Sequence, residues 1–421
     1  MSSLSTGTTT GTAVVLTADT TGDCVIKTGA SATTALTISG NTQSVTLTGT
    51  LVSPTISAPT ISGSTTFPGA TSGSVTLAIP AAAGSTTLTL PSTSGTVLQS
   101  GTAVTEAQGG TGTTTGYYGF KNRIINGGMS TWQRGTTFSS INNQITYGSD
   151  RFFAFTSGAT AQAQIIRSTS VPTGFLYSQQ FGRASGNTVV NQQFLCQCIE
   201  SSNMLDLVGQ TVTVSFWAKA GANYSGGNLT IKLSTGTTAD QSSGTFSGGP
   251  CTGYTGNQAA INTTQAITST FTKYTFTSSA IQAGALSMGL GIGYTPTGTA
   301  GADDNIYITG CQLEVGSTAT SFDYRPYGTE EALCQRYFIN FSDTYGGMIM
   351  VSGTVTVLRY ILPLPVTMRA GPTVTFSNVD SGFTASSLGG SGNDKRINVE
   401  TSASARADFR PRIDVKAEVE L

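Results

Sequence analysis

Apolar residues in the first quarter of the chain alternate with polar or small residues in short runs. Such period-two alternation, in runs rich in Thr and Val and broken by Gly, Pro or Asn, predicts short β-strands. Runs this short bury too little apolar surface to offset the ordering of a single chain. We therefore expect residues 1–116 to form an intertwined stalk in which identical chains share one core, the alternative being a floppy linker. The alternating pairs are Val14 and Leu16, Leu36 and Ile38, Val45 and Leu47, Val75 and Leu77, and Leu88 and Leu90.

Short apolar runs continue through residues 150–327, separated by Gly, Ser, Thr and Asn turns. No long segment there has the 3.6-residue period of a helix, so the pattern predicts an antiparallel β-sandwich. The expected strands cover residues 151–156, 163–166, 189–198, 211–219, 229–233, 273–276, 287–292 and 305–315.

One short helix is expected after the sandwich, at about residues 329–337. Thr329 would be its N-cap, with Glu330 and Glu331 in the first turn, where the helix dipole favours acidic residues. Leu333 and Tyr337 are four residues apart and would share one face. Packed about an axis in several copies, such helices would make a collar.

Strand patterns return after the helix, at residues 348–361, 373–377, 396–401 and 412–420, and predict a C-terminal β-sandwich knob. Twelve of the last 28 residues are charged, with both signs mixed. We expect a solvated outer face or ion pairs between subunits, and as the alternative a receptor contact at the tip. The patterns divide the chain into a stalk (1–116), a sandwich (117–327), a helical collar (328–338) and a knob (339–421).

The charge of the chain is low. Charged residues make up 10% of the 421 residues and the net charge is −1, so nothing favours binding to nucleic acid or to an anionic membrane surface. No apolar run has the ~20 residues of a membrane helix, and the start lacks the features of a signal peptide. We expect synthesis in a cytoplasm without ordinary export. Histidine is absent, which excludes the commonest general base and the commonest metal ligand.

The six cysteines are scattered, so they do not suggest a disulfide framework. Cys196 and Cys198 are two residues apart and would point to the same face of a strand. No second pair or histidine completes a zinc site. We expect buried free thiols.

The stretch from Lys121 to Phe138, here called the seam, separates the Thr-, Ser- and Gly-rich part from the part with ordinary globular composition. Ile124-Ile125 would begin a strand and Gly127-Gly128 would turn it. Trp132 is large enough to anchor a core. Arg134 could pair with Asp150 or stack on an aromatic ring.

The seam, KNRIINGGMSTWQRGTTF, and the following Asp150-Arg151 resemble the opening of receptor-binding regions in bacteriophage tail-fibre proteins. The run RPYGTEEALCQRYF at residues 325–338 resembles the junction before the terminal knob in the same proteins, and Gly109-Gly110-Thr111-Gly112 resembles their stalk hinge. The resemblance implies a homotrimeric virion fibre, assembled in the host cytoplasm. Its N-terminus would attach to other virion proteins, and its C-terminal domains would bind host polysaccharide or lipopolysaccharide. A capsid-decorating head fibre is the alternative.

The runs VSFWAKAG at residues 214–221 and ITGCQLEVG at residues 308–316 resemble core strands of jelly-roll carbohydrate-binding modules. These modules place aromatic rings against sugar faces and bond the hydroxyls with amides and carboxylates. Glycan-binding candidates are residues in Gly-rich loops, the alternative being that the tyrosines only cap the core: Tyr224, Tyr254, Tyr294, Asn223, Asn228 and Asn257. Asp303 and Asp304 are a calcium candidate, with a solvated turn as the alternative.

Catalysis is not expected. A glycan hydrolase needs two carboxylates roughly 5–10 Å apart, and the neighbours Asp303 and Asp304 would point to opposite faces of a strand. The globular region is also too short and irregular for the stacked rungs of a β-helix. We therefore predict a binding protein without a cofactor, and keep a short tailspike with hydrolase activity as a further alternative.

Overall fold

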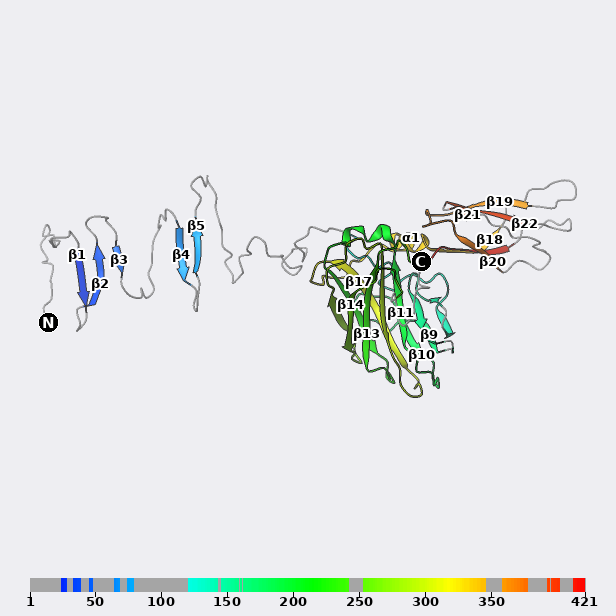
Figure 1. The fold of residues 1–421 in the computed structure, drawn as a ribbon, viewed down its shortest axis with the longest axis horizontal. Coiled ribbons are helices and arrows are strands. Elements are labelled where there is room, and N and C mark those ends of the chain that lie inside the picture. The colour runs from blue at the N-terminus through cyan, green and yellow to red at the C-terminus, as the bar shows by residue number, and fades with distance from the viewer. Residues whose placement is uncertain are drawn as a thin grey trace. The chain divides into compact units, whose positions relative to one another are not determined.

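The computed structural model divides the chain into two compact units, Met1–Thr96 and Val97–Leu421 (Figure 1). In the first unit it describes five strands. In the second it describes residues 120–142, 145–158, 160, 162–241, 253–345, 358–377, 392–393, 395–401 and 412–420. The boundary expected after residue 116 lies outside the described residues and stays a prediction.

The first unit contains β1 (Cys24–Thr28), β2 (Thr33–Ile38) and β3 (Val45–Leu47) in one antiparallel sheet, and β4 (Ser64–Pro68) and β5 (Ser74–Ala78) in a hairpin. Leu36 lies opposite both Ile26 and Leu47, so apolar positions follow each other across the strands. The alternation predicted β2, β3 and β5 but missed β1 and β4. The sharing of a core among chains stays a prediction. The runs at residues 14–16 and 88–90 and the turn at 109–112 lie outside the described residues.

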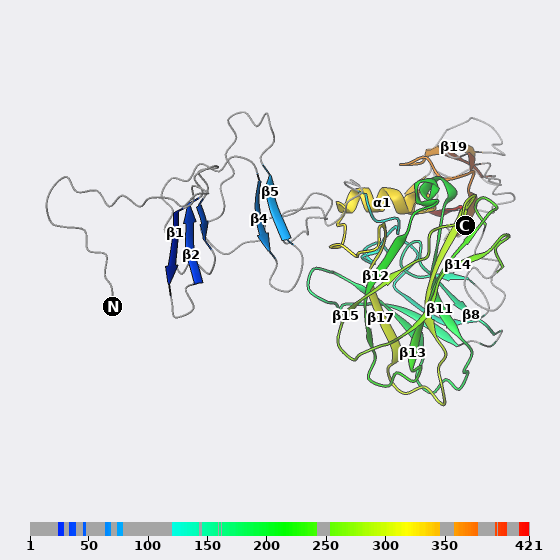
Figure 2. The ribbon, with the colours of Figure 1, turned by 60° about the vertical axis from the view of Figure 1, so that its left-hand side comes forward.

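Two six-stranded antiparallel sheets form the sandwich, as predicted. The first has the order β15-β12-β17-β10-β9-β6 and the second β14-β13-β16-β11-β8-β7. Figure 2 shows the two layers, with β12, β15 and β17 in one and β8, β11, β13 and β14 in the other. The strand bounds are β6 (Thr137–Ile141), β7 (Thr146–Tyr147), β8 (Phe153–Thr156), β9 (Ala163–Ser168), β10 (Ser178–Arg183), β11 (Gln193–Ile199), β12 (Val212–Ala220), β13 (Asn228–Gly236), β14 (Gln258–Ala266), β15 (Thr272–Thr277), β16 (Ser287–Tyr294) and β17 (Asp304–Val315).

Alternate residues of both sheets fill the core between them. On β12 these are Val212, Val214, Phe216 and Ala218, all fully buried, and the other strands contribute in the same way. Each such aliphatic or aromatic side chain stabilises the fold by about 1.5–3 kcal/mol when it leaves water. The intervening residues of β12 therefore face outward.

The four described cysteine side chains are buried free thiols, as expected. Cys196 and Cys198 lie on the same face of β11, in a cluster with Phe153, Phe155 and Phe194 outside the main core. Cys311 belongs to the main core and Cys334 to a small cluster with Ile125 and Tyr337. Burial raises the pKa of the Cys196 thiol well above its usual value, so these groups are chemically inert.

The seam is a loop up to the start of β6 at Thr137, and the prediction of a strand at Ile124-Ile125 is wrong. Its residues form turns instead, because the side chain of Asn126 accepts the backbone N–H groups of Ser130 at 2.9 Å and Thr131 at 3.0 Å. Gly127 passes so close to β17 that a Cβ would lie 2.0 Å from the Cys311 carbonyl oxygen. Trp132 packs on the core and its indole N–H donates to the Met129 carbonyl at 2.7 Å, consistent with the predicted anchoring role.

The helix expected after the sandwich is α1 (Tyr327–Gln335), but its N-cap is Pro326 and not Thr329. The helix begins earlier than expected, because the Pro326 carbonyl accepts the backbone N–H groups of Thr329 at 2.9 Å and Glu330 at 3.1 Å. Glu330 lies in the first turn, as expected, and binds the seam. Its carboxylate accepts the Asn126 backbone N–H and pairs with Arg325 at 3.1 Å. No described helix is long and apolar enough to cross a membrane.

The knob consists of two three-stranded sheets in the described residues, with the orders β18-β23-β20 and β19-β22-β21. Ile397 of β22 and Val415 of β23 share one buried cluster, so the predicted β-sandwich knob is confirmed. Part of the strand expected at 348–361 lies outside the described residues. The bounds are β18 (Phe338–Tyr345), β19 (Leu358–Pro363), β20 (Thr373–Ser377), β21 (Gly392–Asn393), β22 (Arg396–Thr401) and β23 (Arg412–Glu418).

Arg134 holds the seam to the end of the chain. Arg134 pairs with Glu418 at 3.1 Å and Glu420 at 3.0 Å, and its guanidinium lies 3.7 Å from the Phe338 ring centre. It also lies 3.9 Å from Asp150, so both contacts considered for Arg134 occur. The expectation of a solvated face is wrong for Glu420, whose side chain is 6% exposed, whereas Glu418 stays 47% exposed, as expected of a solvated face. Ion pairs between subunits stay a prediction.

Candidate functional site

The outward face of the first sheet carries two aromatic rings on neighbouring strands. On β12, Trp217 and Lys219 alternate with the buried core residues, and both are half-buried. Trp217 lies opposite Thr309 of β17, and Lys219 lies opposite Tyr307. Trp217 and Tyr307 are therefore diagonal neighbours, at roughly 7–8 Å between backbones, which is within reach of aromatic side chains.

Three more rings gather beside this face. The centre of the Phe175 ring is 5.1 Å from that of Phe322 and 5.6 Å from that of Tyr324, and the Phe322 and Tyr324 centres are 4.9 Å apart. Phe175 comes from the loop before β10, whereas the other two come from the segment between β17 and α1. Such edge-to-face and tilted arrangements stabilise aromatic clusters beyond burial alone.

Gly310 connects this cluster to Trp217. It has φ +64°, and a Cβ there would lie 2.7 Å from Phe175 and 2.9 Å from Trp217. The β12–β17 pairing shifts its register at this point, between Ser215 and Trp217. The bulge thus brings Phe175 and Trp217 into one continuous surface. At the other end, Lys219 lies over the rings of both Tyr307 and Phe271. We call this surface the aromatic band and define it as Tyr324, Phe322, Phe175, Trp217, Tyr307 and Phe271.

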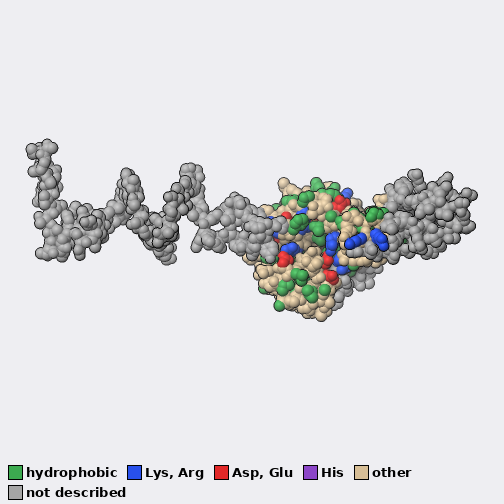
Figure 3. All heavy atoms as spheres, turned by 90° about the horizontal axis from the view of Figure 1, so that it is seen from above, with side chains coloured by type: hydrophobic (Ala, Val, Ile, Leu, Met, Phe, Trp, Pro, Cys, Tyr) green, Lys and Arg blue, Asp and Glu red, His purple; other side chains and the backbone are tan. Residues whose placement is uncertain are grey.

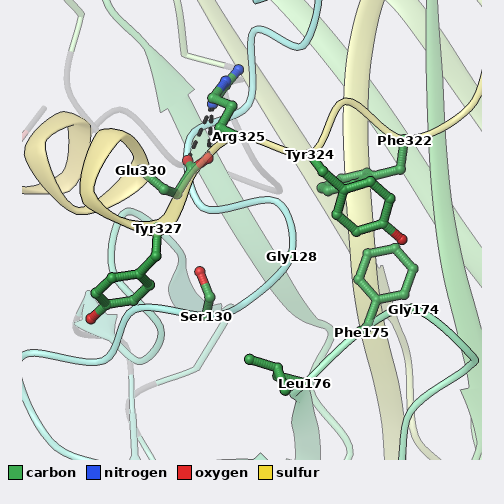
Figure 4. Close-up of a pocket in the computed structure, with 10 residues that line it drawn as sticks. All are labelled: Gly128, Ser130, Gly174, Phe175, Leu176, Phe322, Tyr324, Arg325, Tyr327 and Glu330. Atoms are coloured by element: carbon green, nitrogen blue, oxygen red, sulfur yellow. Dashed lines mark hydrogen bonds and ion pairs between the residues drawn. The ribbon is translucent and has the colours of Figure 1, made fainter.

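A pocket of about 180 Å³ lies at the Tyr324 end of the band. Figure 4 shows Phe175, Phe322 and Tyr324 on one side of it, with Tyr327, Ser130 and Leu176 on the other. Three of the lining side chains are unusually exposed for apolar residues: Leu176 is 74% exposed, Tyr324 60% and Tyr327 58%. Exposed apolar residues in one patch are typical of a binding surface.

The charges at this pocket neutralise each other. The Arg325 guanidinium pairs with Glu330 at 3.1 Å (Figure 4). It also donates to the Ile124 carbonyl at 3.3 Å. Partial burial raises the pKa of Tyr324, and burial together with Glu331 and other nearby acidic groups raises that of Tyr327. Both hydroxyls therefore stay neutral donors and acceptors at physiological pH. The pocket can take an uncharged ligand with an apolar face and hydroxyl groups.

The six residues predicted to bind glycan differ in exposure: the three tyrosines are buried or half-buried, and the three asparagines are exposed. Tyr254 is 4% exposed and Tyr294 is fully buried, so neither ring offers a face to solvent. Tyr224 is half-buried and its ring centre is 4.8 Å from that of Tyr294. Exposed positions are occupied by the three amides, Asn223, Asn228 and Asn257. The binding role of all six stays a prediction.

Both carboxylates of the calcium candidate are engaged by protein donors. Asp304 is fully buried and accepts Arg183 Nε at 2.8 Å and the Ser225 N–H at 2.8 Å. Asp303 accepts the Ala222 N–H and the Tyr307 hydroxyl, each at 3.0 Å. The alternative of a solvated turn is wrong for Asp304. Among the described residues no group of three or more acidic or cysteine side chains is placed to hold a metal ion.

The buried Arg183 organises the loops at this end of the sandwich. Its guanidinium donates to the carbonyl oxygens of Val189 at 2.9 Å, Thr297 at 2.9 Å and Gly298 at 2.8 Å. Burial of an arginine is costly unless its N–H donors form hydrogen bonds or ion pairs. Asp304 and Arg183 are thus structural groups that fix three loops.

The aromatic band is not among the candidates predicted from the sequence, because those candidates are tyrosines and asparagines in Gly-rich loops. One signal was present: in VSFWAKAG the alternation that buries Phe216 places Trp217 on the opposite face. Phe175, Phe322 and Tyr324 carried no such signal, since they lie in irregular segments far apart in the sequence.

No family model matches the chain, and no curated protein matches it in sequence. Among solved structures, the enzymatically active domain of tailspike protein 4 of bacteriophage CBA120 is 12% identical over 47% of this chain and 22% of that chain, with a TM-score of 0.27. A CBM4 module is 18% identical over 46% of this chain and 99% of its own, with a TM-score of 0.28. A CBM22 xylan-binding domain from Paenibacillus barcinonensis is 14% identical over 44% of this chain and 94% of its own, with a TM-score of 0.24. The structural neighbours therefore include a phage tailspike and carbohydrate-binding modules, and the chain spans 22% of the tailspike structure.

Proposed function

We propose that this chain is a virion fibre that binds host cell-surface glycan through the aromatic band of its sandwich. The observation that carries the glycan part is the band itself. Its rings line a face that is only partly buried, and Tyr324 of the band and Tyr327 of the adjoining pocket expose more than half of their surface. Aromatic rings of this kind stack on the apolar faces of sugars while their hydroxyls and neighbouring polar groups bond the sugar hydroxyls.

The polar surroundings of the band support the same ligand class. Ser130 lies in the pocket, and the half-buried Gln180 lies opposite Tyr307 on the neighbouring strand. The surface in Figure 3 is mostly uncharged, with short apolar patches and few charged side chains. Neutral polar groups around a few rings suit a polyhydroxylated ligand better than a nucleic acid or a lipid surface.

The fibre part of the proposal rests on the two motifs that resemble phage fibres. In the structure these motifs contact each other, since Glu330 binds Asn126 and Arg325 donates to the carbonyls of Asn122 and Ile124. They form the joint between sandwich, α1 and knob, which fits a mount for a receptor-binding head. We propose that the fibre is a homotrimer in a virion, with its N-terminus attached to other virion proteins.

The proposed function is non-catalytic. Acidic residues that sequence analysis would offer to a hydrolase have structural partners: Asp240 pairs with Arg369 at 3.6 Å, Asp304 with Arg183, and Glu330 with Arg325. Glu314 accepts the Thr320 backbone N–H at 2.9 Å and its hydroxyl at 2.6 Å. A carboxylate used in this way is a poor candidate for proton transfer to a bound sugar.

Staining of bacterial cells tests the proposal. The fluorescently labelled full chain should stain some strains of a diverse panel, and surface polysaccharide extracted from those strains should compete with the staining. Failure to stain any strain would contradict receptor binding and favour a head fibre with a structural role. Staining that polysaccharide does not reduce would contradict a glycan receptor. Loss of polymer length on incubation would instead favour the tailspike hydrolase.

A further inference from the structure

Lys219 is a cation held between two rings at the far end of the aromatic band. Its Nζ lies 4.7 Å from the centre of the Tyr307 ring and 5.3 Å from that of Phe271. The side chain is half-buried. Contacts with two rings restrain the flexible stem of the lysine, so little rotamer freedom remains to be lost when a ligand binds.

Lys219 differs from most other cations of the described residues in having no acidic partner. Arg123, Arg134, Arg151, Arg183, Arg325, Arg336 and Arg369 each form an ion pair. Lys121 and Lys273 donate to oxygens of Thr320, at 2.5 Å and 2.6 Å. The charge of Lys219 is therefore available to a ligand.

Asp303 is an acidic residue that shares the neighbour Tyr307 with Lys219 but forms no ion pair with it. Its carboxylate lies at the hydroxyl edge of Tyr307 and accepts the Tyr307 hydroxyl, the Ala222 N–H and the Asn305 amide, each at 3.0 Å. Burial and Asp303 raise the pKa of Tyr307 to about 12. No phenolate therefore opposes an anion at neutral pH.

Trp217 lies two residues before Lys219 on the same outward face of β12. Alternate residues of a strand are roughly 6.5–7 Å apart, comparable with the reach from the centre of a sugar ring to an acidic substituent. From this juxtaposition we propose that the Trp217–Lys219 pair binds an acidic sugar residue. The sugar ring lies on the indole of Trp217, and its carboxylate, sulfate or phosphate group accepts a hydrogen bond from the Lys219 ammonium. The inference rests on the proposed function and specifies its ligand class.

Tryptophan fluorescence gives a direct test, because the chain has only two tryptophans, Trp132 and Trp217. In the full chain carrying Trp132→Phe, the tryptophan fluorescence comes from Trp217 alone. The probes are oligogalacturonate, its methyl ester, in which the carboxylates are masked, and a sulfated galactan oligosaccharide. We expect oligogalacturonate or the sulfated probe to change the emission saturably. The methyl ester should bind at least roughly tenfold more weakly, because it loses one charge-assisted hydrogen bond.

Variants of the same background assign the effect to Lys219. Lys219→Met keeps the apolar stem and should weaken binding of the acidic probe roughly ten- to a hundredfold, to the level of the ester. Lys219→Arg should retain binding. Lys232→Met is the matched control, since Lys232 also lies over a ring, 5.3 Å from Phe194, but on the second sheet, and it should titrate like the parent.

Three outcomes would overturn the inference. If the acid and the ester bind equally, or if Lys219→Met binds like the parent, the charge of Lys219 does not contribute to recognition. Neither result would contradict glycan binding by the band. Absence of any emission change with both acidic probes would also overturn the inference, and the proposed function would then stand or fall on the staining of cells. If only the sulfated probe binds, sulfate is the group that Lys219 recognises.

Discussion

Arg151 and Glu420 form a buried ion pair that joins the start of the sandwich to the end of the chain. Their side chains are 2% and 6% exposed. The Arg151 guanidinium also donates to the Cys198 carbonyl at 2.7 Å and lies 3.6 Å from the Tyr337 ring centre. Burial lowers the pKa of Arg151, but Glu420, Tyr337, Tyr147 and Cys198 together outweigh burial and raise it. The pair therefore stays charged, and the knob is fixed to the sandwich by its last strand.

Replacing Arg151 should destabilise the protein strongly. Arg151→Met leaves Glu420 largely buried, with only Arg134 as a partner. Removing one member of a buried pair typically costs about 3–5 kcal/mol. Denaturant unfolding should show this loss in the free energy of unfolding, and hydrogen exchange should show reduced protection of β23.

The matched control is Arg123→Met. Arg123 pairs with Asp206, whose side chain is 41% exposed, and such a surface pair contributes at most about 1 kcal/mol. Equal stability losses in the two variants would show that the Arg151–Glu420 pair does not fix the knob.

Gly127 is required by the close approach of the seam to β17. Gly127→Ala would place a Cβ 2.0 Å from the Cys311 carbonyl oxygen and 3.1 Å from its carbon. Backbone atoms cannot yield easily, so we expect a lower midpoint of thermal unfolding. Gly328→Ala, in the first turn of α1, meets nothing within 4 Å and should be neutral or stabilising by up to about 1 kcal/mol, the difference in helix propensity. A harmless Gly127→Ala would contradict the packing described here.

Glu200 should give the fold an acid-labile component. Its carboxylate accepts the Tyr337 hydroxyl at 2.6 Å and pairs with Arg336 at 3.2 Å. Burial raises the pKa of Glu200, but hydrogen bonds from Tyr337, Ser202 and Arg336 outweigh burial and lower it below the usual 4.5. A lowered folded-state pKa means that the ionised carboxylate stabilises the fold above about pH 4.5 and that this stabilisation is lost as the pH falls through the folded pKa.

Thermal unfolding between about pH 3 and 7 checks this sign. Glu200→Gln should be less stable than the parent at pH 7, and the difference should shrink as the pH falls. Tyr337→Phe, which keeps the ring under Arg151, should flatten the same pH dependence by removing one donor. A constant difference at all pH values would rule out the ionisation of Glu200 as the cause.

The oligomeric state tests the expected stalk. Light scattering coupled to size exclusion should give a mass three times that of the 43.1-kDa chain, because the short strands of the first unit need partner chains to complete a core. A stable monomer at micromolar concentration would contradict the intertwined stalk and the homotrimer.

The alternation of apolar and polar residues predicted strands that carry regularly spaced apolar side chains. It missed strands made mostly of polar residues. The expected bounds at 373–377 and 396–401 match β20 and β22. In contrast, β10 (SQQFGR) and β14 (QAAINTTQA) carry few apolar residues and were missed. Their strand structure comes from pairing with neighbours such as β17 and β13, a tertiary effect that local sequence does not record.

The site was harder to predict than the fold. Tyr294 ends β16, in phase with the core residues Met288, Leu290 and Ile292, so its inward position follows from alternation. The meeting of Phe175 with Phe322 depends instead on the path of two irregular segments and on the bulge at Gly310. No local pattern encodes such a path, because it is set by the register between β12 and β17.

A glycan-array screen of the full chain beside its Trp217→Ala variant tests the central claim most directly. The array should include neutral and acidic bacterial polysaccharides, and Trp132→Phe serves as the control for loss of a tryptophan outside the band. We predict that the parent and the control bind the same set of glycans and that Trp217→Ala, folded by circular dichroism, loses that binding. Binding that survives in Trp217→Ala, or no binding by the parent to any glycan, would contradict the aromatic band as a glycan receptor site.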